Sequence, residues 1–252
     1  MKVYGIIPAR LQSTRLPRKL LLAETGRPLL EYTWRAASQC GSLSEVIVAA
    51  DSDEIFNAVN AFGARCELTG EHPSGTDRIA EVADRCCPDG DIFVNIQGDE
   101  PEIDPANIDA VVRALVTCPQ AEMATLATPL QTLAQVRASS CVKVVCAADG
   151  HALYFSRAPI PFCRDRDPDE ILQSEYPWLL HLGIYAYRRE FLLQLTKLKP
   201  SRLEQLEKLE QLRALEAGAR IQVAVVEHHS VGIDTPEDYA RFVERHRSNP
   251  AR

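Results

Sequence analysis

The sequence contains no apolar run long enough to cross a membrane. Its first apolar run, Val3–Ile7, is also far too short for the core of a signal peptide. A net charge of −7 has the wrong sign for a protein that binds the phosphate backbone of nucleic acids. We therefore expect a soluble, cytoplasmic protein with no membrane insertion and no nucleic-acid partner.

Cysteine pairs at metal-ligand spacing are missing as well. None of the eight cysteines forms a CxxC pair, and no histidine accompanies them at ligand spacing, so a zinc site is not expected. With 46% hydrophobic residues in 252 positions, the chain can bury a sizeable core without a disulfide framework. The pattern predicts reduced thiols.

Short apolar runs that stop in polar residues indicate a parallel sheet. They are Val3–Ile7, Val46–Ala50 and Ile92–Ile96, and a helical stretch, Asp53–Phe62, is closed by Gly63. Buried runs that alternate with helical segments are typical of a mainly parallel sheet with helices on its faces. Since ligands of such sheets bind at the carboxyl ends of the strands, the polar residues after these runs should meet at one site.

The pattern changes near residue 142. Val142–Ala147 and His151–Ser156 flank Asp149-Gly150, which predicts a tight hairpin. The fold class is therefore α/β, a mostly parallel nucleotide-binding sheet flanked by helices, with an antiparallel insert at about 142–187 in one domain spanning 1–252. Further expectations are a mobile charged loop at 164–170, a strand at 178–187, one leucine-rich helix from about 203 to 217, a strand at 221–226 and a helix from about 236 to 247.

A basic loop follows the first predicted strand of this acidic chain. Arg10, Arg15, Arg18 and Lys19 stand in a segment with no acidic residue between positions 1 and 23. Like charges in one loop repel each other unless an anion offsets them, and arginine forks suit phosphate oxygens. The loop lacks the glycines of a dinucleotide-binding or Walker sequence. A solvated basic surface is the alternative, but the position at a strand end favours a phosphate site.

Two carboxylates are candidates for a Mg²⁺ site. Asp99 follows the third buried run, and Glu100 should point the other way if the strand alternation persists. Gly98 would let a ligand approach the backbone closely. Mg²⁺ typically takes one or two carboxylates plus substrate phosphates.

The second candidate, Asp234, has an alternative role. Asp234 followed by Glu237 fits a helix capping box. Thr235 followed by Pro236 fits better, with threonine as the N-cap and proline at the first helical position. That assignment leaves the Asp234 side chain available for a metal, and both roles stay open at this point.

Several short motifs follow each other along the chain from about residue 3 to 245. They are Gly5-Ile-Ile-Pro-Ala-Arg10, Ser13-Thr-Arg-Leu-Pro17, Ser74-Gly-Thr-Asp-Arg78, Val94-Asn-Ile-Gln-Gly-Asp-Glu-Pro101, Ala152-Leu-Tyr-Phe-Ser-Arg157, His181-Leu-Gly-Ile-Tyr185, Leu209-Glu-Gln-Leu-Arg213 and Gly232-Ile-Asp-Thr-Pro-Glu-Asp238. In order and spacing they closely resemble the 3-deoxy-D-manno-octulosonate (Kdo) cytidylyltransferases. The first motif is shared with sialic-acid cytidylyltransferases, whereas the combination is specific.

The resemblance implies a fold like that of the nucleotide-sugar transferases and a homodimer built through the antiparallel region. It implies a Mg²⁺-dependent reaction in which CTP and Kdo give CMP-Kdo and pyrophosphate for lipopolysaccharide synthesis. The sugar's anomeric hydroxyl would attack the α-phosphorus in line, so positioning and charge neutralisation dominate the catalysis.

The resemblance also assigns roles by position. Catalytic roles fall on Arg10, Arg15, Lys19 and Asp99. Nucleotide binding falls on Ala9, Arg10, Arg15, Lys19, Ser74, Arg78 and Gln97. Sugar binding falls on Gln97, Arg157, His181, Tyr185, Glu210 and Gln211, and metal binding on Asp99 and Asp234. The chain departs from the family where Gly-Lys-Pro is common, because it has Arg18-Lys19-Leu20 instead.

Alternatives remain at this stage. His181 shares a strand face with Gly183 and Tyr185, which is typical of a cleft wall, but a structural histidine with satisfied hydrogen bonds is the other interpretation. A cytidylyltransferase for another acidic sugar, such as a sialic acid, is the nearest alternative function. A catalytically silent nucleotide-binding regulator and a nucleotide-sugar hydrolase are more distant ones.

Overall fold

The computed structural model describes residues 1–175, 178–228 and 230–248. The chain divides into two compact units, of which the first contains Met1–Asp109 and Ser230–Arg252 and the second Ala110–His229. The single domain expected from the sequence stays a prediction. In the described part of the chain, no helix is both long and apolar enough to traverse a bilayer.

The first unit contains a parallel sheet with the strand order β3-β2-β1-β4. β1 pairs with β2 from Tyr4↔Glu45 to Ala9↔Ala50, and with β4 from Val3↔Ile92. The order reverses between β1 and β4, which is where parallel sheets open a crevice for ligands at their carboxyl ends. The strands are β1 (Val3–Ala9), β2 (Glu45–Ala50), β3 (Arg65–Leu68) and β4 (Ile92–Asn95).

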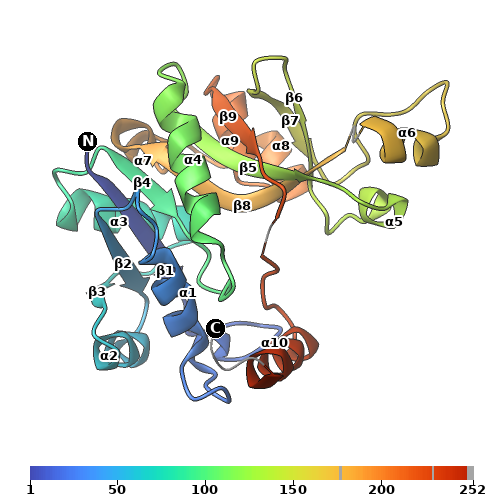
Figure 1. The fold of residues 1–252 in the computed structure, drawn as a ribbon. Coiled ribbons are helices and arrows are strands. Elements are labelled where there is room, and N and C mark those ends of the chain that lie inside the picture. The colour runs from blue at the N-terminus through green and yellow to red at the C-terminus, as the bar shows by residue number, and fades with distance from the viewer. Residues whose placement is uncertain (176–177, 229, 249–252) are drawn as a thin grey trace. The chain divides into compact units, whose positions relative to one another are not determined.

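Side-chain caps start α2 and α3 of this unit, whose helices Figure 1 labels. The side chain of Ser52 accepts a hydrogen bond from the Ile55 N–H, which starts α2, and the chain turns away at Gly63, whose φ is 80°. The predicted helical stretch after β2 is therefore confirmed. The helices are η1 (Lys19–Leu21, a 3₁₀ turn), α1 (Leu29–Ala37), α2 (Asp53–Ala61), α3 (Gly75–Cys86) and α10 (Pro236–Ser248), while α4 (Pro105–Thr117) begins here and continues into the second unit.

α10 returns from the end of the chain and packs on α1 and on the loop after β1. Tyr239, Phe242 and Val243 of α10 join Leu16 and Tyr32 in one buried cluster. The Tyr32 and Phe242 rings meet edge to face, with centroids 5.4 Å apart. This apolar contact fixes the segment before α10 beside the basic loop.

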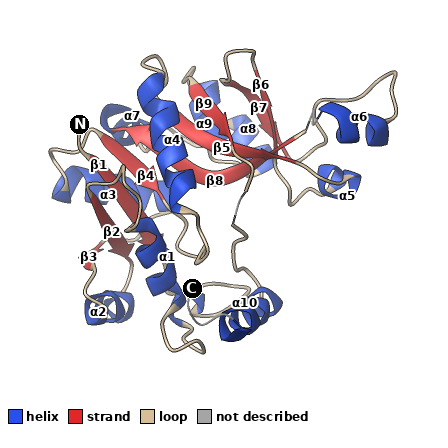
Figure 2. Ribbon diagram, in the orientation of Figure 1, coloured by secondary structure: helices blue, strands red, loops and turns tan. Residues whose placement is uncertain are grey.

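The second unit is mixed in strand direction. β5 pairs antiparallel with β8 and parallel with β9, and the hairpin β6–β7 joins β8 through β6 (Figure 2). The hairpin turns at Gly150, whose φ is 83°, as its sequence predicts. The elements are β5 (Met123–Pro129), α5 (Leu133–Arg137), β6 (Lys143–Cys146), β7 (Ala152–Ser156), α6 (Pro168–Glu175), β8 (Leu179–Arg188), α7 (Arg189–Leu195), α8 (Arg202–Glu207), α9 (Gln211–Glu216) and β9 (Ile221–Val225).

The single leucine-rich helix predicted at 203–217 is wrong. A capping box formed by Ser201 and Glu204 starts α8, which ends at Lys208 in the left-handed conformation with φ 54°. Leucines at steps of three drift around a helix and cannot all face one core. The break lets Leu209 be buried while Leu206 stays 70% exposed.

The prediction of a mobile loop at 164–170 is also wrong for its last residues, because α6 begins at Pro168. Proline is favoured at the first helical position. The Asp167 side chain accepts a hydrogen bond from the Asp169 N–H at 2.8 Å, which supports the first turn. The segment before it, with Arg164 and Asp165, is exposed.

Candidate active site

A cavity of about 440 Å³ lies at the carboxyl ends of β1 and β4, the position that the reversal of strand order predicts. Its walls come from the loop after β1, the turn after β4, the start of α3 and the segment before α10. The predicted site residues that line it are Arg10, Arg15, Lys19, Ser74, Gln97, Asp99 and Asp234.

Lys19 lies between the two candidate metal ligands. Its Nζ is 2.5 Å from Asp99 Oδ2 and 3.0 Å from Asp234 Oδ1, and it donates to the Ile233 carbonyl at 3.0 Å. Burial disfavours the charged ammonium, but the two carboxylates outweigh that effect and raise the pKa of Lys19. All three donors of the ammonium are therefore engaged at one point of the cavity.

Asp234 does not cap α10. The Asp238 N–H donates to the Thr235 hydroxyl at 3.2 Å, and the Thr235 N–H donates back to the Asp238 carboxylate at 2.9 Å. This reciprocal pair confirms threonine as the cap. The Asp234 carboxylate instead reaches Arg15, with Oδ2 2.9 Å from the guanidinium.

The carboxylates of Asp99 and Asp234 fit a divalent cation in chemistry and placement, because oxygens of both lie within 3.0 Å of the same lysine nitrogen. Among the residues that the structure describes, no group of three or more His, Cys, Asp and Glu side chains is placed to hold a metal ion. Two carboxylates with substrate phosphates are nevertheless a usual Mg²⁺ ligand set. Mg²⁺ binding here stays a prediction.

Glu100 turns away from this pair. Its carboxylate accepts a hydrogen bond from the Ser230 hydroxyl at 2.6 Å. Burial raises the pKa of the Glu100 carboxyl to about 7, against the Ser230 hydrogen bond and with added repulsion from Asp99.

This shift makes stability depend on pH. The pKa of Glu100 is higher in the folded chain than in the unfolded one. The contribution of Glu100 to the stability of the fold is therefore complete below the unfolded pKa of 4.5 and is lost as pH rises through about 7. The side chain of the Glu100→Gln variant stays neutral. At about pH 8 we therefore expect its free energy of unfolding to exceed that of the unsubstituted chain by about 2 kcal/mol. The advantage should vanish at about pH 4.5. Urea unfolding at both pH values measures it, and an equal difference at both would contradict the assignment.

Gly98 serves packing. A Cβ there would lie 3.3 Å from the Ile7 side chain and 3.4 Å from the Pro8 carbonyl. The Gly98 carbonyl accepts a hydrogen bond from Thr33 at 3.0 Å. The glycine therefore lets the turn that carries Asp99 lie directly on β1. Gly98 also lines the cavity, and the close approach of a ligand to its backbone stays a prediction.

Arg18, the departure from the family pattern, adopts the left-handed conformation with φ 57° and ψ 27°. Its guanidinium lies outside the cavity and pairs with Glu54. Left-handed backbone costs roughly 1 kcal/mol at a residue other than glycine, and an exposed ion pair contributes little.

We therefore expect Arg18→Gly to be more stable than Arg18→Ala by about 1 kcal/mol, the reverse of the order within a helix. Neither variant should change kcat/KM more than about twofold, since surface changes away from a site are usually small. Chemical unfolding and steady-state rates measure the two effects. An Ala variant more stable than the Gly variant would contradict the role of the backbone.

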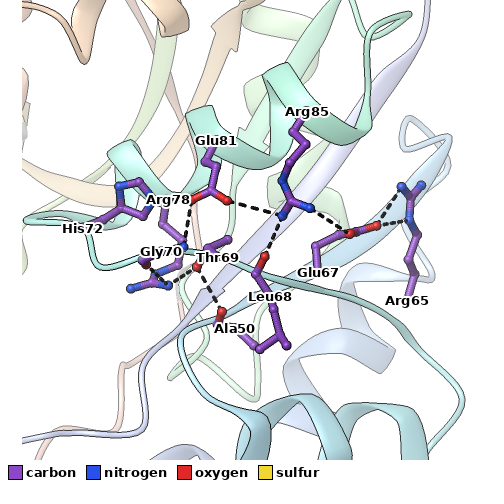
Figure 3. A network of polar contacts seen from close by, with 10 residues as sticks. All are labelled: Ala50, Arg65, Glu67, Leu68, Thr69, Gly70, His72, Arg78, Glu81 and Arg85. Carbon is purple, nitrogen blue, oxygen red and sulfur yellow. Dashed lines mark hydrogen bonds and ion pairs between the residues drawn. The ribbon is translucent and has the colours of Figure 1, made fainter.

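The remaining nucleotide residues lie around the start of α3. Ala9 is buried at the end of β1. Ser74 caps α3 by accepting from the Asp77 N–H at 3.2 Å, which turns the helix N-terminus toward the cavity, a favourable place for an anion. Arg78 lies beneath the loop before α3, only 2% exposed, and binds Thr69 and the Gly70 carbonyl (Figure 3).

In the second unit, three of the predicted sugar residues form one cluster. His181 Nε2 lies 3.0 Å from the Thr125 hydroxyl, and its ring packs on Tyr185 with centroids 5.5 Å apart. Tyr185 donates its hydroxyl to Gln211 Oε1 at 3.2 Å. Burial lowers the pKa of His181 to about 3, so the ring is neutral at physiological pH. The Gln211 Nε2 is buried without a hydrogen-bond partner among the described residues.

Arg157 is bound to main chain rather than to this cluster. Its guanidinium donates to the carbonyls of Ser139 and Glu207 at 2.9 and 2.7 Å. The Glu207 carboxylate accepts from the Arg157 N–H at 2.9 Å. Glu210 stands at the position that precedes α9 and makes no side-chain capping bond there.

Comparison with known proteins agrees with this geometry. A sequence model of the cytidylyltransferases matches residues 4–221. The 3-deoxy-manno-octulosonate cytidylyltransferase of Geobacter sulfurreducens is 45% identical over 250 residues, covering 97% of this chain and 99% of its own. The protein of that name from Rhodopirellula baltica is 48% identical over 247 residues, covering 97% and 98%. The chain belongs to the 3-deoxy-manno-octulosonate cytidylyltransferase family.

Structural similarity supports the same family. A solved CMP:2-keto-3-deoxy-manno-octonic acid synthetase complexed with CTP has a TM-score of 0.91 and 37% identity, over 98% of this chain and 99% of that one. The 4-diphosphocytidyl-2C-methyl-D-erythritol synthase of Anaerococcus prevotii, at 15% identity and a TM-score of 0.62, shares the fold. The predicted fold class and the family resemblance are thereby confirmed, and the sialic-acid alternative is not favoured.

Sequence reasoning missed contributors to this cytidylyltransferase site. The main chain of Ile233 donates to the Asp99 carbonyl at 2.9 Å and accepts from Lys19, so it joins the two candidate metal ligands. A main-chain role leaves no sequence signal. Asp51, at the end of β2, accepts from the Leu11 N–H at 2.9 Å and shapes the basic loop. The strand-end rule placed this residue at the same edge of the sheet but gave it no role.

Proposed function

We propose that this chain transfers CMP from CTP to 3-deoxy-D-manno-octulosonate (Kdo) and releases pyrophosphate. The observation that carries the proposal is the convergence of Lys19 and Arg15 with Asp99 and Asp234 at the carboxyl ends of β1 and β4. Cations that bind phosphate and carboxylates that hold a metal are the two parts that nucleotidyl transfer requires.

In the proposed reaction the anomeric hydroxyl oxygen of Kdo forms a bond to the α-phosphorus of CTP. The bond between the α-phosphorus and the bridging oxygen breaks, and pyrophosphate leaves with that electron pair while the hydroxyl proton is released. Arg10, Arg15 and Lys19 hold the phosphates and offset the charge that develops on the leaving group. Ser74 and the N-terminus of α3 add neutral donors on the same cavity wall.

Asp99 and Asp234 would hold Mg²⁺, which supplies Lewis-acid charge to the phosphates when bound. For the sugar acid we propose the cluster of His181, Tyr185 and Gln211. A neutral imidazole and a buried amide with an unused donor suit hydroxyl and carboxylate groups. Gln97, Arg157 and Glu210 keep the sugar-binding roles that the family resemblance implies, as proposals.

The proposal includes a cytoplasmic location, a role in lipopolysaccharide synthesis and a homodimer. All eight cysteines are free thiols, which supports a reducing compartment. Large apolar side chains are exposed in the second unit, with Phe162 at 85% and Leu153 at 57%, and such side chains often mark an interface between copies.

The dimer has a direct test. Phe162→Asp should convert a dimer into monomers in analytical ultracentrifugation, because a charge at the interface is left unpaired on association. Leu68→Asp in the first unit, where the side chain is 39% exposed, is the matched control and should leave the mass unchanged. A monomeric wild-type protein would contradict the dimer.

The activity is tested by pyrophosphate release with a panel of nucleotides and sugar acids. Release should require CTP, Kdo and Mg²⁺ together, with much weaker use of ATP or GTP. CTP binding without pyrophosphate release would identify a silent regulator. CMP release from added CMP-Kdo without CTP would identify a hydrolase, and equal turnover with N-acetylneuraminate would overturn the choice of sugar.

A further inference from the structure

The loop between β3 and α3, residues 69–74, is held by one face of α3 (Figure 3). Arg78, Glu81 and Arg85 follow each other at steps of three and four, so their side chains point to the same side of the helix. Figure 3 shows all three pointing toward the segment that leads into this loop.

Glu81 makes the central contacts. Its Oε2 accepts from the Gly70 N–H at 3.0 Å and lies 2.6 Å from His72 Nε2. Its Oε1 lies 3.4 Å from the Arg85 guanidinium. One half-buried carboxylate, 28% exposed, therefore binds both the main chain and a side chain of the loop.

The arginines on either side bind carbonyl oxygens of the same segment. Arg78 donates to the Gly70 carbonyl at 3.3 Å, and Arg85 donates to the Leu68 carbonyl at 2.6 Å. The Thr69 hydroxyl adds a bond to the Ala50 carbonyl at the end of β2 at 3.0 Å. The two arginines therefore donate hydrogen bonds to carbonyl oxygens of this segment, whereas Glu81 accepts a hydrogen bond from the Gly70 N–H.

The loop in turn contacts the phosphate site. The Arg10 guanidinium donates to the His72 carbonyl at 3.4 Å, and both Arg10 and Ser74 line the cavity. A shift of residues 70–72 would therefore move an arginine and a helix N-terminus that face the nucleotide. Glu81 itself does not line this cavity, so its influence passes through the loop.

We propose that Glu81 is a positioning residue for the nucleotide, holding the β3–α3 loop so that Arg10 and Ser74 are preorganised for the triphosphate. The role rests on the proposed function of this cavity. It predicts that loss of Glu81 weakens CTP binding selectively, because the loop must then be ordered by the nucleotide itself.

The experiment compares Glu81→Ala and Glu81→Gln with Glu67→Gln. Glu67 belongs to the same network and is similarly exposed at 23%, but its carboxylate binds the guanidinium groups of Arg65 and Arg85 and not the loop. Glu81→Ala should raise KM for CTP about tenfold or more, with kcat and KM for Kdo changed less than about twofold. Glu81→Gln keeps an acceptor for the Gly70 amide, so its KM for CTP should lie between those of the wild type and Glu81→Ala. The KM of Glu67→Gln should match that of the wild type.

Hydrogen exchange gives a second readout that needs no substrate. The Gly70 amide should exchange about tenfold faster in Glu81→Ala and unchanged in Glu67→Gln. An active enzyme whose KM for CTP is unchanged in Glu81→Ala, or equally raised in Glu67→Gln, would overturn the proposal, as would a fall in kcat alone. If the wild type released no pyrophosphate, the proposed function would fail, and unchanged Gly70 exchange would separately overturn the loop contact.

Discussion

Lys19→Ala should lower kcat/KM by about 30- to 1000-fold, equivalent to about 2–4 kcal/mol of transition-state stabilisation. The physical reason is the position of its ammonium in the cavity, where it is held by Asp99, Asp234 and the Ile233 carbonyl. A cation fixed in advance at a phosphate site costs no reorganisation when charge develops on the leaving group.

The neighbouring Arg18 offers the matched control. Its side chain is 60% exposed and pairs with Glu54 outside the cavity, so Arg18→Ala should keep full activity. Lys19→Ala also removes the ammonium between Asp99 and Asp234, and Arg15 then still pairs with Asp234 but not with Asp99. Its melting temperature should therefore fall without Mg²⁺ and recover when Mg²⁺ is added. Full kcat/KM in Lys19→Ala, measured by steady-state pyrophosphate release, would show that the basic loop is a solvated surface and not a phosphate site.

Asp234→Asn should lower activity by about 100-fold or more while the melting temperature holds. Asparagine keeps the size of the side chain but lacks the charge that a metal needs. Capping of α10 is not at stake, because Thr235 and Asp238 supply it through their own hydrogen bonds. Activity and thermal unfolding, measured on the same preparation, separate the two roles.

A magnesium titration sharpens this test. If Asp99 and Asp234 hold one ion, each Asn variant should require far more Mg²⁺. On a free-energy scale, the loss of activity in the double variant should be much smaller than the sum of the two single losses. Asp238→Asn is the structural control, since Asp238 belongs to the helix cap and should affect stability more than the Mg²⁺ requirement. A fully active Asp234→Asn enzyme at low Mg²⁺ would leave Asp99 as the sole carboxylate ligand.

Local patterns predicted much of the first unit and of the cavity. The polar residues after β1, β2 and β4 could be placed at one edge because parallel strands share their carboxyl ends. The preference for Thr235 over Asp234 as the cap followed from the proline at the next position. The hairpin turn at Gly150 was similarly encoded in two adjacent residues.

The features that were missed depend on tertiary contacts. The predicted helix across Lys208 was wrong because a lysine gives no signal that its backbone will be left-handed. Asp234 lies 215 residues from Lys19 in sequence, so no local pattern could reveal their ion pair. Glu81 reads as one more solvated residue on a helix until the loop it binds is seen.

The identity of the product is the most direct test of the proposed transfer of CMP from CTP to Kdo. The enzyme is incubated with Mg²⁺, Kdo and CTP labelled at the α-phosphorus. The products are then separated and identified by mass spectrometry. We expect the label to appear in CMP-Kdo, with one pyrophosphate released for each molecule formed. Label found only in CTP or in free CMP, or transferred equally well to N-acetylneuraminate, would contradict the proposed transfer.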